Sequence, residues 1–161
     1  MRELYIGNKN YSSWSLRPWL LMRHLGIDFE ERGLRLSWAD DSPFKTTLRR
    51  IAPTGLVPLL VDDGFAVWDS LAIAEYLAEH CAGKAVWPTD AKRRARARSV
   101  CAEMHSGFAD LRGTFPMNLE AELGDVGRRL LAENAAAARD VARIDALFRR
   151  AVRQLRAVPV R

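Results

Sequence analysis

The chain has 161 residues, of which 48% are apolar, so it can form one ordinary domain or two small ones with a buried core. Its net charge is +5, yet residues 1–80 carry 9 basic and 11 acidic side chains, whereas the remainder carries 16 and 9. No apolar run is long enough to span a membrane, and the first residues lack the pattern of a signal peptide. A cytoplasmic protein with a nearly neutral first half and a basic second half is therefore expected.

The first elements are expected to form a strand–helix–strand unit. Residues 3–7 are predicted to form a strand, which leads into the stretch "NYSSWSLRPW". Its three serines are good residues for capping a helix N-terminus, and Pro18 is tolerated in a first helical turn. Gly26 is expected to end this helix, and residues 29–36 are expected to form a second strand.

A β-hairpin is the clearest pattern in the chain. Two apolar runs flank the dipeptide Asp63-Gly64, which is typical of a tight hairpin turn. A helical turn is expected before it, around residues 45–49, and a helix capped by Asp69 or Ser70 is expected after it. The order βαβαββα predicts a small α/β domain with a mixed sheet.

The second half is predicted to be helical throughout. The segment "KAVWPTD" has the composition of a linker, and one long helix is expected from Asp90 to Pro116. A further helical region is expected over residues 120–156, interrupted or bent near Gly124 and Gly127. The expected domains are therefore an α/β domain over residues 1–82 and an all-α domain over residues 88–161.

The serine-rich stretch has two interpretations. Three hydroxyls at the start of a helix are common as capping groups alone. A helix N-terminus also exposes N–H groups and partial positive charge, so a hydroxyl there can stabilise an anion or a thiolate. One hydrogen bond to a charged sulfur, together with the helix end, can lower a thiol pKa by about one to two units.

Two further motifs can bind a peptide-like ligand. Val57-Pro58 at a strand start either shapes a loop or forms a cis peptide bond that turns the Val57 backbone toward a ligand strand. Asp69 and Ser70 either cap a helix or bind an amino-acid head group, with Ser70 on the carboxylate and Asp69 on the ammonium. Together with the serines, the motifs suit a peptide that carries a thiol.

The motifs "SSWSLRPWL", "APTGLVPLLVDDG" and "VWDSLAIAEYLAE" resemble those of glutathione S-transferases over almost the entire chain, and the serine run is similar to that of zeta-like bacterial members. The resemblance implies a thioredoxin-like glutathione-binding domain and an all-α C-terminal domain that is incomplete. It implies a cytoplasmic, detoxifying homodimer that binds glutathione as co-substrate and a small hydrophobic electrophile. It also implies site residues. These are Ser12 as the thiolate-stabilising residue with Ser13 as its rival, Val57 and Pro58 at the cysteinyl backbone, Asp69 and Ser70 at the γ-glutamyl end, and Lys45, or else Arg49, at the glycyl carboxylate.

Two departures from the family pattern bear on function. Trp14 stands where zeta-like members have cysteine, which argues against a maleylacetoacetate isomerase in particular. The tail "RRAVRQLRAVPVR" lacks the expected apolar core pattern, so the helical domain is expected to be shortened. A glutathione-binding remnant without catalytic activity is therefore the second hypothesis, and a maleylacetoacetate isomerase-like enzyme is a further alternative.

Other functions are less consistent with the sequence. The basic run Lys92–Arg98 lacks interleaved aromatic residues and is expected to be a solvated helix face, without binding to nucleic acid. Cys81, Cys101 and the three histidines form no pattern of metal ligands, so no metal is expected. The chain also lacks the GxSxG motif of many serine hydrolases.

Overall fold

The computed structural model describes residues 1–156, with side chains described as far as residue 151. It divides into two compact units, Met1–Arg98 and Ser99–Arg161. The first unit includes the beginning of helix α4 (Ala91–Ser106), whose Arg98 donates two hydrogen bonds to the Glu75 carboxylate, at 2.8 and 2.7 Å. The domain limits expected from the sequence, 1–82 and 88–161, stay predictions.

The first unit has the element order expected from the sequence. Its sheet has the strand order β2-β1-β3-β4, with β1 parallel to β2 and antiparallel to β3, and β3 antiparallel to β4. This mixed sheet with flanking helices confirms the thioredoxin-like α/β prediction. The elements are β1 (Arg2–Ile6), α1 (Ser13–His24), β2 (Glu30–Gly33), α2 (Pro43–Ile51), β3 (Leu59–Asp62), β4 (Phe65–Trp68) and α3 (Ser70–His80).

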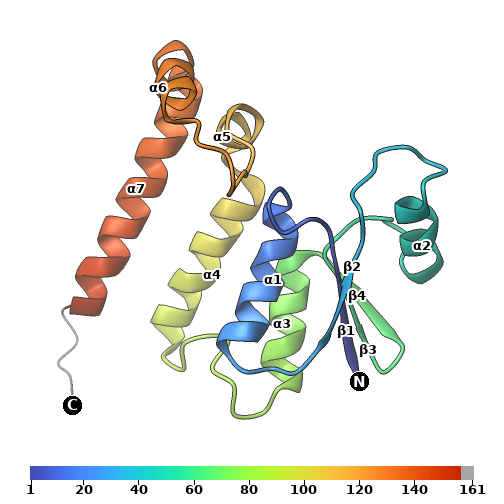
Figure 1. Cartoon of the computed structure of the whole chain (residues 1–161). Helices are drawn as coiled ribbons and strands as arrows, with labels where there is room; N and C mark the ends of the chain where they lie inside the picture. Colours follow the sequence, from blue (N-terminus) through green and yellow to red (C-terminus); the bar gives the residue numbers. More distant parts are fainter. Residues whose placement is uncertain (157–161) are drawn as a thin grey trace. The chain divides into compact units, whose positions relative to one another are not determined.

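Apolar side chains of the two central strands pack into hydrophobic clusters on both faces of the sheet. Helices α1 and α3 lie side by side on one face (Figure 1), where Leu4, Ile6 and Leu60 join a core cluster with residues of both helices. Leu59 belongs to a second cluster, which contains Phe44 and Leu48 of α2. The sheet is therefore a rigid layer from whose strand ends the functional loops extend.

The hairpin prediction is confirmed. Strands β3 and β4 pair antiparallel from Leu59 opposite Trp68 to Asp62 opposite Phe65. Asp63 and Gly64 connect them with φ angles of 47° and 86°, as a two-residue turn with two left-handed positions requires. The helix expected around residues 45–49 is longer than predicted, because Ser42 caps α2 through a hydrogen bond from the Lys45 N–H (3.2 Å).

The second unit is helical, as predicted, but the helices end at other residues. The single helix expected from Asp90 to Pro116 is wrong: α4 (Ala91–Ser106) ends before Gly107, and α5 (Ala109–Thr114) follows. Between them Phe108 adopts a left-handed conformation with φ of 60° and is buried. An aromatic residue rarely adopts this conformation, so a phenylalanine at position 108 does not predict a break in the helix.

The helical region over residues 120–156 is interrupted, as expected, but not within the segment between Gly124 and Gly127. Helix α6 (Gly124–Glu133) begins at the first of these glycines and contains the second. The break lies at Asn134, whose Oδ1 accepts hydrogen bonds from the N–H groups of Ala136 and Ala137 and so caps α7 (Ala135–Arg156). Residues 157–161 of the arginine-rich tail lie outside the described residues.

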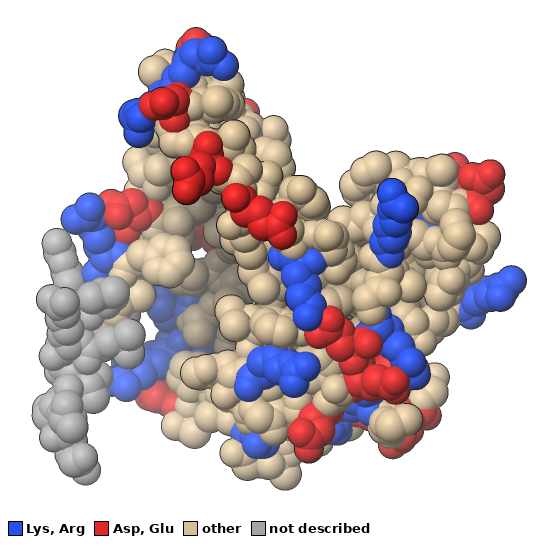
Figure 2. Space-filling model, in the orientation of Figure 1, with Lys and Arg blue, Asp and Glu red and all other residues tan. Residues whose placement is uncertain are grey.

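Several charged side chains of the first unit form ion pairs with one another. Arg32 bridges Glu3 and Glu30, and Arg2 pairs with Asp62 at 2.9 Å. Acidic and basic side chains are accordingly interspersed on the face drawn in Figure 2. Within residues 1–156, no helix is both long and apolar enough to cross a membrane.

Candidate functional site

The strand register brings the three sequence motifs to one end of the sheet. Tyr5 of β1, Leu59 of β3 and Trp68 of β4 form one row across the sheet. The serine stretch follows β1, Val57-Pro58 precedes β3, and Asp69-Ser70 follows β4. Because β1 and β4 run in the same direction, helices α1 and α3 both begin at this end (Figure 1). The positive ends of both helix dipoles therefore lie here.

Ser12 is the N-cap residue of α1. Its Oγ accepts a hydrogen bond from the Ser15 N–H at 3.4 Å, and it lies 2.8 Å from the Ser15 Oγ. Ser12 is only 9% exposed, so its hydroxyl is almost buried. Of the three serines that could cap this helix, Ser12 is therefore the one whose side chain does so.

Ser13 and Ser15 take other places. Ser13 is the first residue of α1 and is half-buried, and the described residues give its hydroxyl no hydrogen-bond partner. Ser15 is 2% exposed, and its Oγ accepts a hydrogen bond from the Gly7 N–H at 3.1 Å. Gly7 is the residue directly after β1, so this bond fixes the strand exit to the first turn of α1.

The Val57-Pro58 segment has the cis peptide bond that the sequence left open. Among residues 1–156, no hydrogen bond reaches the backbone N–H or C=O of Val57. Lys45 of α2 donates from its ammonium to the carbonyl of Gly55, at 3.2 Å, two residues before Val57. Arg49, the second choice for a carboxylate partner, is instead engaged with Asp40 at 2.7 Å.

Asp69 and Ser70 begin helix α3. Asp69 is the N-cap residue, with φ of 77°, and its Oδ1 accepts hydrogen bonds from the Leu71 N–H (2.8 Å) and the Ala72 N–H (3.4 Å). Ser70 is 6% exposed, and its Oγ is buried without a hydrogen-bond partner among the described residues. A buried hydroxyl without a partner is costly to stability, and a bound ligand is one way to satisfy it.

A polar anchor that the sequence did not reveal holds the loop before Ser12. Lys9 pairs with Glu31 of β2 at 2.7 Å, and the Trp19 indole Nε1–H donates to the same carboxylate at 2.7 Å. The Lys9 ammonium also lies 5.1 Å from the centroid of the Trp19 ring. These residues are far apart in sequence, and only the parallel pairing of β1 with β2 brings them together.

The anchor should make stability dependent on acid. Burial alone would raise the pKa of Glu31, but the hydrogen bonds from Lys9 and Trp19 outweigh it and hold the pKa below its ordinary value of 4.5. A lowered folded-state pKa stabilises the protein above the ordinary value, and this contribution disappears as the pH falls through the lowered one. Glu31→Gln should therefore cost about 1–2 kcal/mol at neutral pH, and the difference from the parent should shrink as the pH falls below 4.5 through the lowered pKa of Glu31.

Urea unfolding of both proteins between pH 3 and pH 8 measures this difference. Glu30→Gln is the matched control, because Glu30 lies on the same strand and pairs with Arg32, but its side chain is more exposed (42%) than that of Glu31 (25%). Such a surface pair contributes about 0–1 kcal/mol. An equal loss in the two variants at neutral pH would contradict the anchoring role of Glu31.

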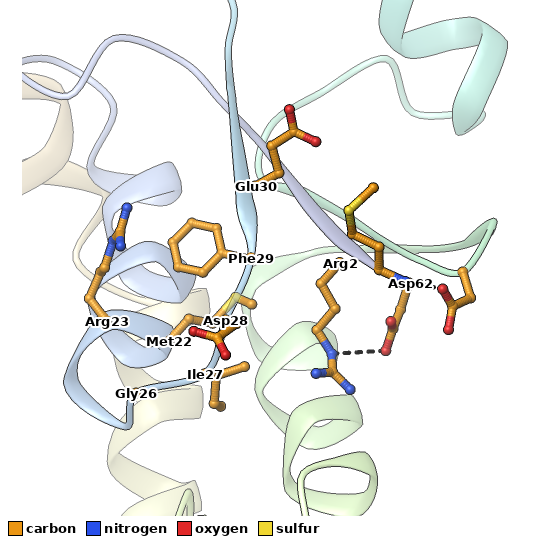
Figure 3. A pocket seen from close by; sticks show the side chains of 11 residues that line it. Arg2, Met22, Arg23, Gly26, Ile27, Asp28, Phe29, Glu30 and Asp62 are labelled. Atoms are coloured by element: carbon orange, nitrogen blue, oxygen red, sulfur yellow. Dashed lines mark hydrogen bonds and ion pairs between the residues drawn. The ribbon is translucent and has the colours of Figure 1, made fainter.

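A hollow also exists at the opposite end of the sheet. It is lined by residues that include Arg2, Met22 and Phe29, and Figure 3 shows the hydrogen bond between Arg2 and Asp62 at its side. It contains none of the site residues predicted from the sequence, and its charges are of both signs. In the described part of the chain, no group of three or more His, Cys, Asp or Glu residues could hold a metal ion.

Comparison with known proteins agrees with the arrangement of the first unit. Residues 11–80 match the family described as glutathione S-transferase, N-terminal domain. A probable maleylacetoacetate isomerase of Caenorhabditis elegans is 32% identical over 108 residues, which are 67% of this chain and 48% of that protein. A maleylacetoacetate isomerase of Pseudomonas aeruginosa is 30% identical over 123 residues, 76% of this chain and 57% of that protein.

Residues 11–80 are therefore a glutathione S-transferase N-terminal domain. A solved glutathione transferase homologue from Burkholderia, with bound glutathione, is 33% identical and superposes with a TM-score of 0.56 over 68% of this chain and 56% of that one. The chain spans about half the length of the curated isomerases that it matches.

Proposed function

We propose that this protein is a glutathione transferase, which binds glutathione at the end of the sheet where α1 and α3 begin and activates its thiol for attack on a small electrophile. The observation that carries the proposal is the buried, unpartnered Ser70 Oγ at the same end of the sheet as the Ser12 hydroxyl. Two helix N-termini there suit the two negative groups of one ligand, a carboxylate and a thiolate.

The peptide part of glutathione is bound by backbone and charged groups. The N–H and C=O of Val57 pair with the cysteinyl backbone as an added strand would, beside Pro58. Ser70 donates its hydroxyl and its N–H to the γ-glutamyl carboxylate, and Asp69 accepts from the γ-glutamyl ammonium. Lys45, whose ammonium already lies at the loop before Val57, binds the glycyl carboxylate.

The thiol is activated by stabilising its ionised form. A free thiol with a pKa of about 8.5 is mostly protonated at neutral pH. The Ser12 hydroxyl donates to the sulfur, and the N-terminus of α1 adds its partial positive charge. The thiol proton leaves to water, and Ser12 does not act as the base, since an alcohol is far too weakly basic for that role.

The reaction is a nucleophilic substitution or addition at a carbon atom. The thiolate sulfur forms a bond to the electrophilic carbon, and in substitution the leaving group departs with the bonding electron pair. The electrophile is a small hydrophobic molecule, and detoxification is the corresponding cellular role. Cytoplasmic glutathione would supply the co-substrate.

Isomerisation of an unsaturated diacid is the second candidate function. Several relatives at about 30–32% identity are named maleylacetoacetate isomerase, which favours it. In such a reaction the thiolate adds to a carbon–carbon double bond, the new single bond rotates, and elimination of the same thiolate restores both glutathione and the double bond. Trp14, beside the serines in this chain, argues for a different electrophile than that of the zeta-like members.

A homodimer is proposed as the assembled form. Strand β4 is an edge strand of the sheet, and its Phe65 and Trp68 side chains are 61% and 42% exposed. Exposed aromatic side chains on an edge strand are typical of an interface. Analytical ultracentrifugation should give twice the chain mass, and a monomer that does not change with concentration would contradict the proposal.

Calorimetry and a conjugation assay test the function together. Glutathione should bind with a measurable heat, and absorbance near 240 nm should report its thiolate in the complex. The protein should then accelerate the conjugation of chlorodinitrobenzene. Binding without conjugation of this or a panel of other electrophiles would support the non-catalytic remnant, and the absence of binding would overturn the proposal. Isomerisation of maleylacetoacetate without conjugation would favour the second candidate.

A further inference from the structure

The geometry points to Ser15 as a positioning residue that fixes the direction in which the Ser12 hydroxyl donates. This inference rests on the proposed function and assigns a role to a serine that touches neither glutathione nor the electrophile. Ser15 is buried, and its Oγ lies between the Gly7 N–H, at 3.1 Å, and the Ser12 Oγ, at 2.8 Å.

The hydrogen bonds of this cluster can be counted. Two hydroxyl groups at 2.8 Å share one hydrogen, and either of them can donate it. If the Ser12 hydroxyl donates to Ser15, the hydroxyl hydrogen of Ser15 finds no acceptor in the described part of the chain, although Ser15 is buried. If Ser15 donates to Ser12, both hydrogens are usable, and the Ser12 hydrogen points away from the cluster.

The second arrangement determines the polarity of Ser12. Its oxygen then accepts from the Ser15 N–H and from the Ser15 hydroxyl, so that both lone pairs are occupied. Ser12 can only donate to a further partner, which is the polarity that a thiolate requires. A chain of hydrogen bonds from the Gly7 N–H through Ser15 also polarises the Ser12 hydroxyl and makes it a better donor.

The position of Gly7 supports a fixed geometry for the first link. A Cβ atom at this residue would lie 2.5 Å from Leu36 Cδ2, so the backbone here is in close contact with the segment that follows β2. The Gly7 N–H is therefore held in place by packing on one side and by Ser15 on the other. Ser15 links this rigid strand exit to the hydroxyl that is proposed to contact sulfur.

Ser15→Ala tests the inference through the ionisation of bound glutathione. Absorbance near 240 nm as a function of pH reports the pKa of the glutathione thiol in the complex. In Ser15→Ala this pKa should be higher by about half to one unit, which gives a three- to tenfold lower thiolate fraction at neutral pH. Affinity for S-methylglutathione, which has no ionisable thiol, should change less than twofold. Ser15→Thr, which keeps the hydroxyl, should restore the parental titration.

Controls separate this role from a purely structural one. Ile73→Val weakens the same core without touching the hydrogen-bond cluster, and it should leave the thiol titration unchanged. If Ser15→Ala does not fold, Ser15→Cys carries the test, because its weak donor should shift the titration in the same direction by less. An unchanged titration in the Ser15 variants, with a shift in Ser12→Ala, would overturn the inference alone. An unchanged titration in Ser12→Ala as well would overturn the proposed activation of the thiol.

Discussion

Replacing Ser12 with alanine is expected to lower the rate of glutathione conjugation about 10- to 100-fold at neutral pH. The reason is the loss of a hydrogen bond to a charged sulfur, which corresponds to about one to two pKa units of the bound thiol. The rate should recover as the pH rises toward the pKa of free glutathione, because the thiolate then forms without assistance. The measurement is kcat/KM as a function of pH for the parent and the variant.

Ser12→Ala should also lower the stability of the first unit. The same hydroxyl caps α1, and the loss of an N-cap side chain costs about 0.5–2 kcal/mol. Ser12→Thr, which can cap and donate, should preserve most of both properties. Catalysis and stability should therefore change together here, since one side chain carries both functions.

Ser13→Ala is the comparison that decides between the two serines. Ser13 caps nothing, and the described residues give its hydroxyl no partner, so its removal should change stability by less than about 0.5 kcal/mol. If Ser12 contacts the sulfur, Ser13→Ala should keep most of the conjugation rate. A large loss of rate in Ser13→Ala and a small one in Ser12→Ala would reverse the assignment.

The sequence was sufficient to predict the strands and helices of the first unit because they depend on strong local signals, whereas the site residues stay a prediction. The Asp63-Gly64 dipeptide requires left-handed backbone angles at two successive positions, and a hairpin is where such a pair is used. Once the strand order was known, the loops after β1 and β4 and the loop before β3 had to meet at one end. The residue types in those loops then suggested a thiol peptide.

Details that depend on tertiary contacts could not be predicted. The choice of Ser12 rather than Ser15 as the cap depends on where the Gly7 N–H lies, which a list of serines does not contain. The break at Phe108 occurs at a residue that rarely takes a left-handed conformation, and it is stabilised by burial. The pairing of Lys9 with Glu31 depends on the register of two parallel strands.

The break between α6 and α7 is a different case, because a local signal existed. Asn134 stands directly before four alanines, and asparagine is among the best N-cap residues. Gly124 and Gly127 were the stronger helix-breaking residues by type, although an isolated glycine costs a helix only about 1 kcal/mol. The Asn134 side-chain amide also donates to the Thr114 hydroxyl at 2.9 Å, which further holds the break between the two helices.

Ser70→Ala is expected to separate binding from stability. Without a ligand, the Ser70 Oγ is buried and has no partner among the described residues, so its removal should leave the free energy of unfolding unchanged or raise it by about 1 kcal/mol. With glutathione, the variant loses a hydrogen bond to a carboxylate, and the Kd should rise about 10- to 100-fold. Thermal unfolding and calorimetry measure the two effects.

Ser42→Ala is the matched control for the stability arm, because Ser42 is also a buried serine but its Oγ caps α2. That variant should lose about 0.5–2 kcal/mol, in contrast to Ser70→Ala. For the binding arm, the dipeptide cysteinylglycine lacks the γ-glutamyl carboxylate, so its affinity should be the same for the parent and for Ser70→Ala. If Ser70→Ala weakened both ligands equally, the hydroxyl would act on the site as a whole. Only a loss confined to glutathione assigns Ser70 to the γ-glutamyl end. The Ser70 hydroxyl would then contribute to ligand binding and not to the stability of the unliganded protein.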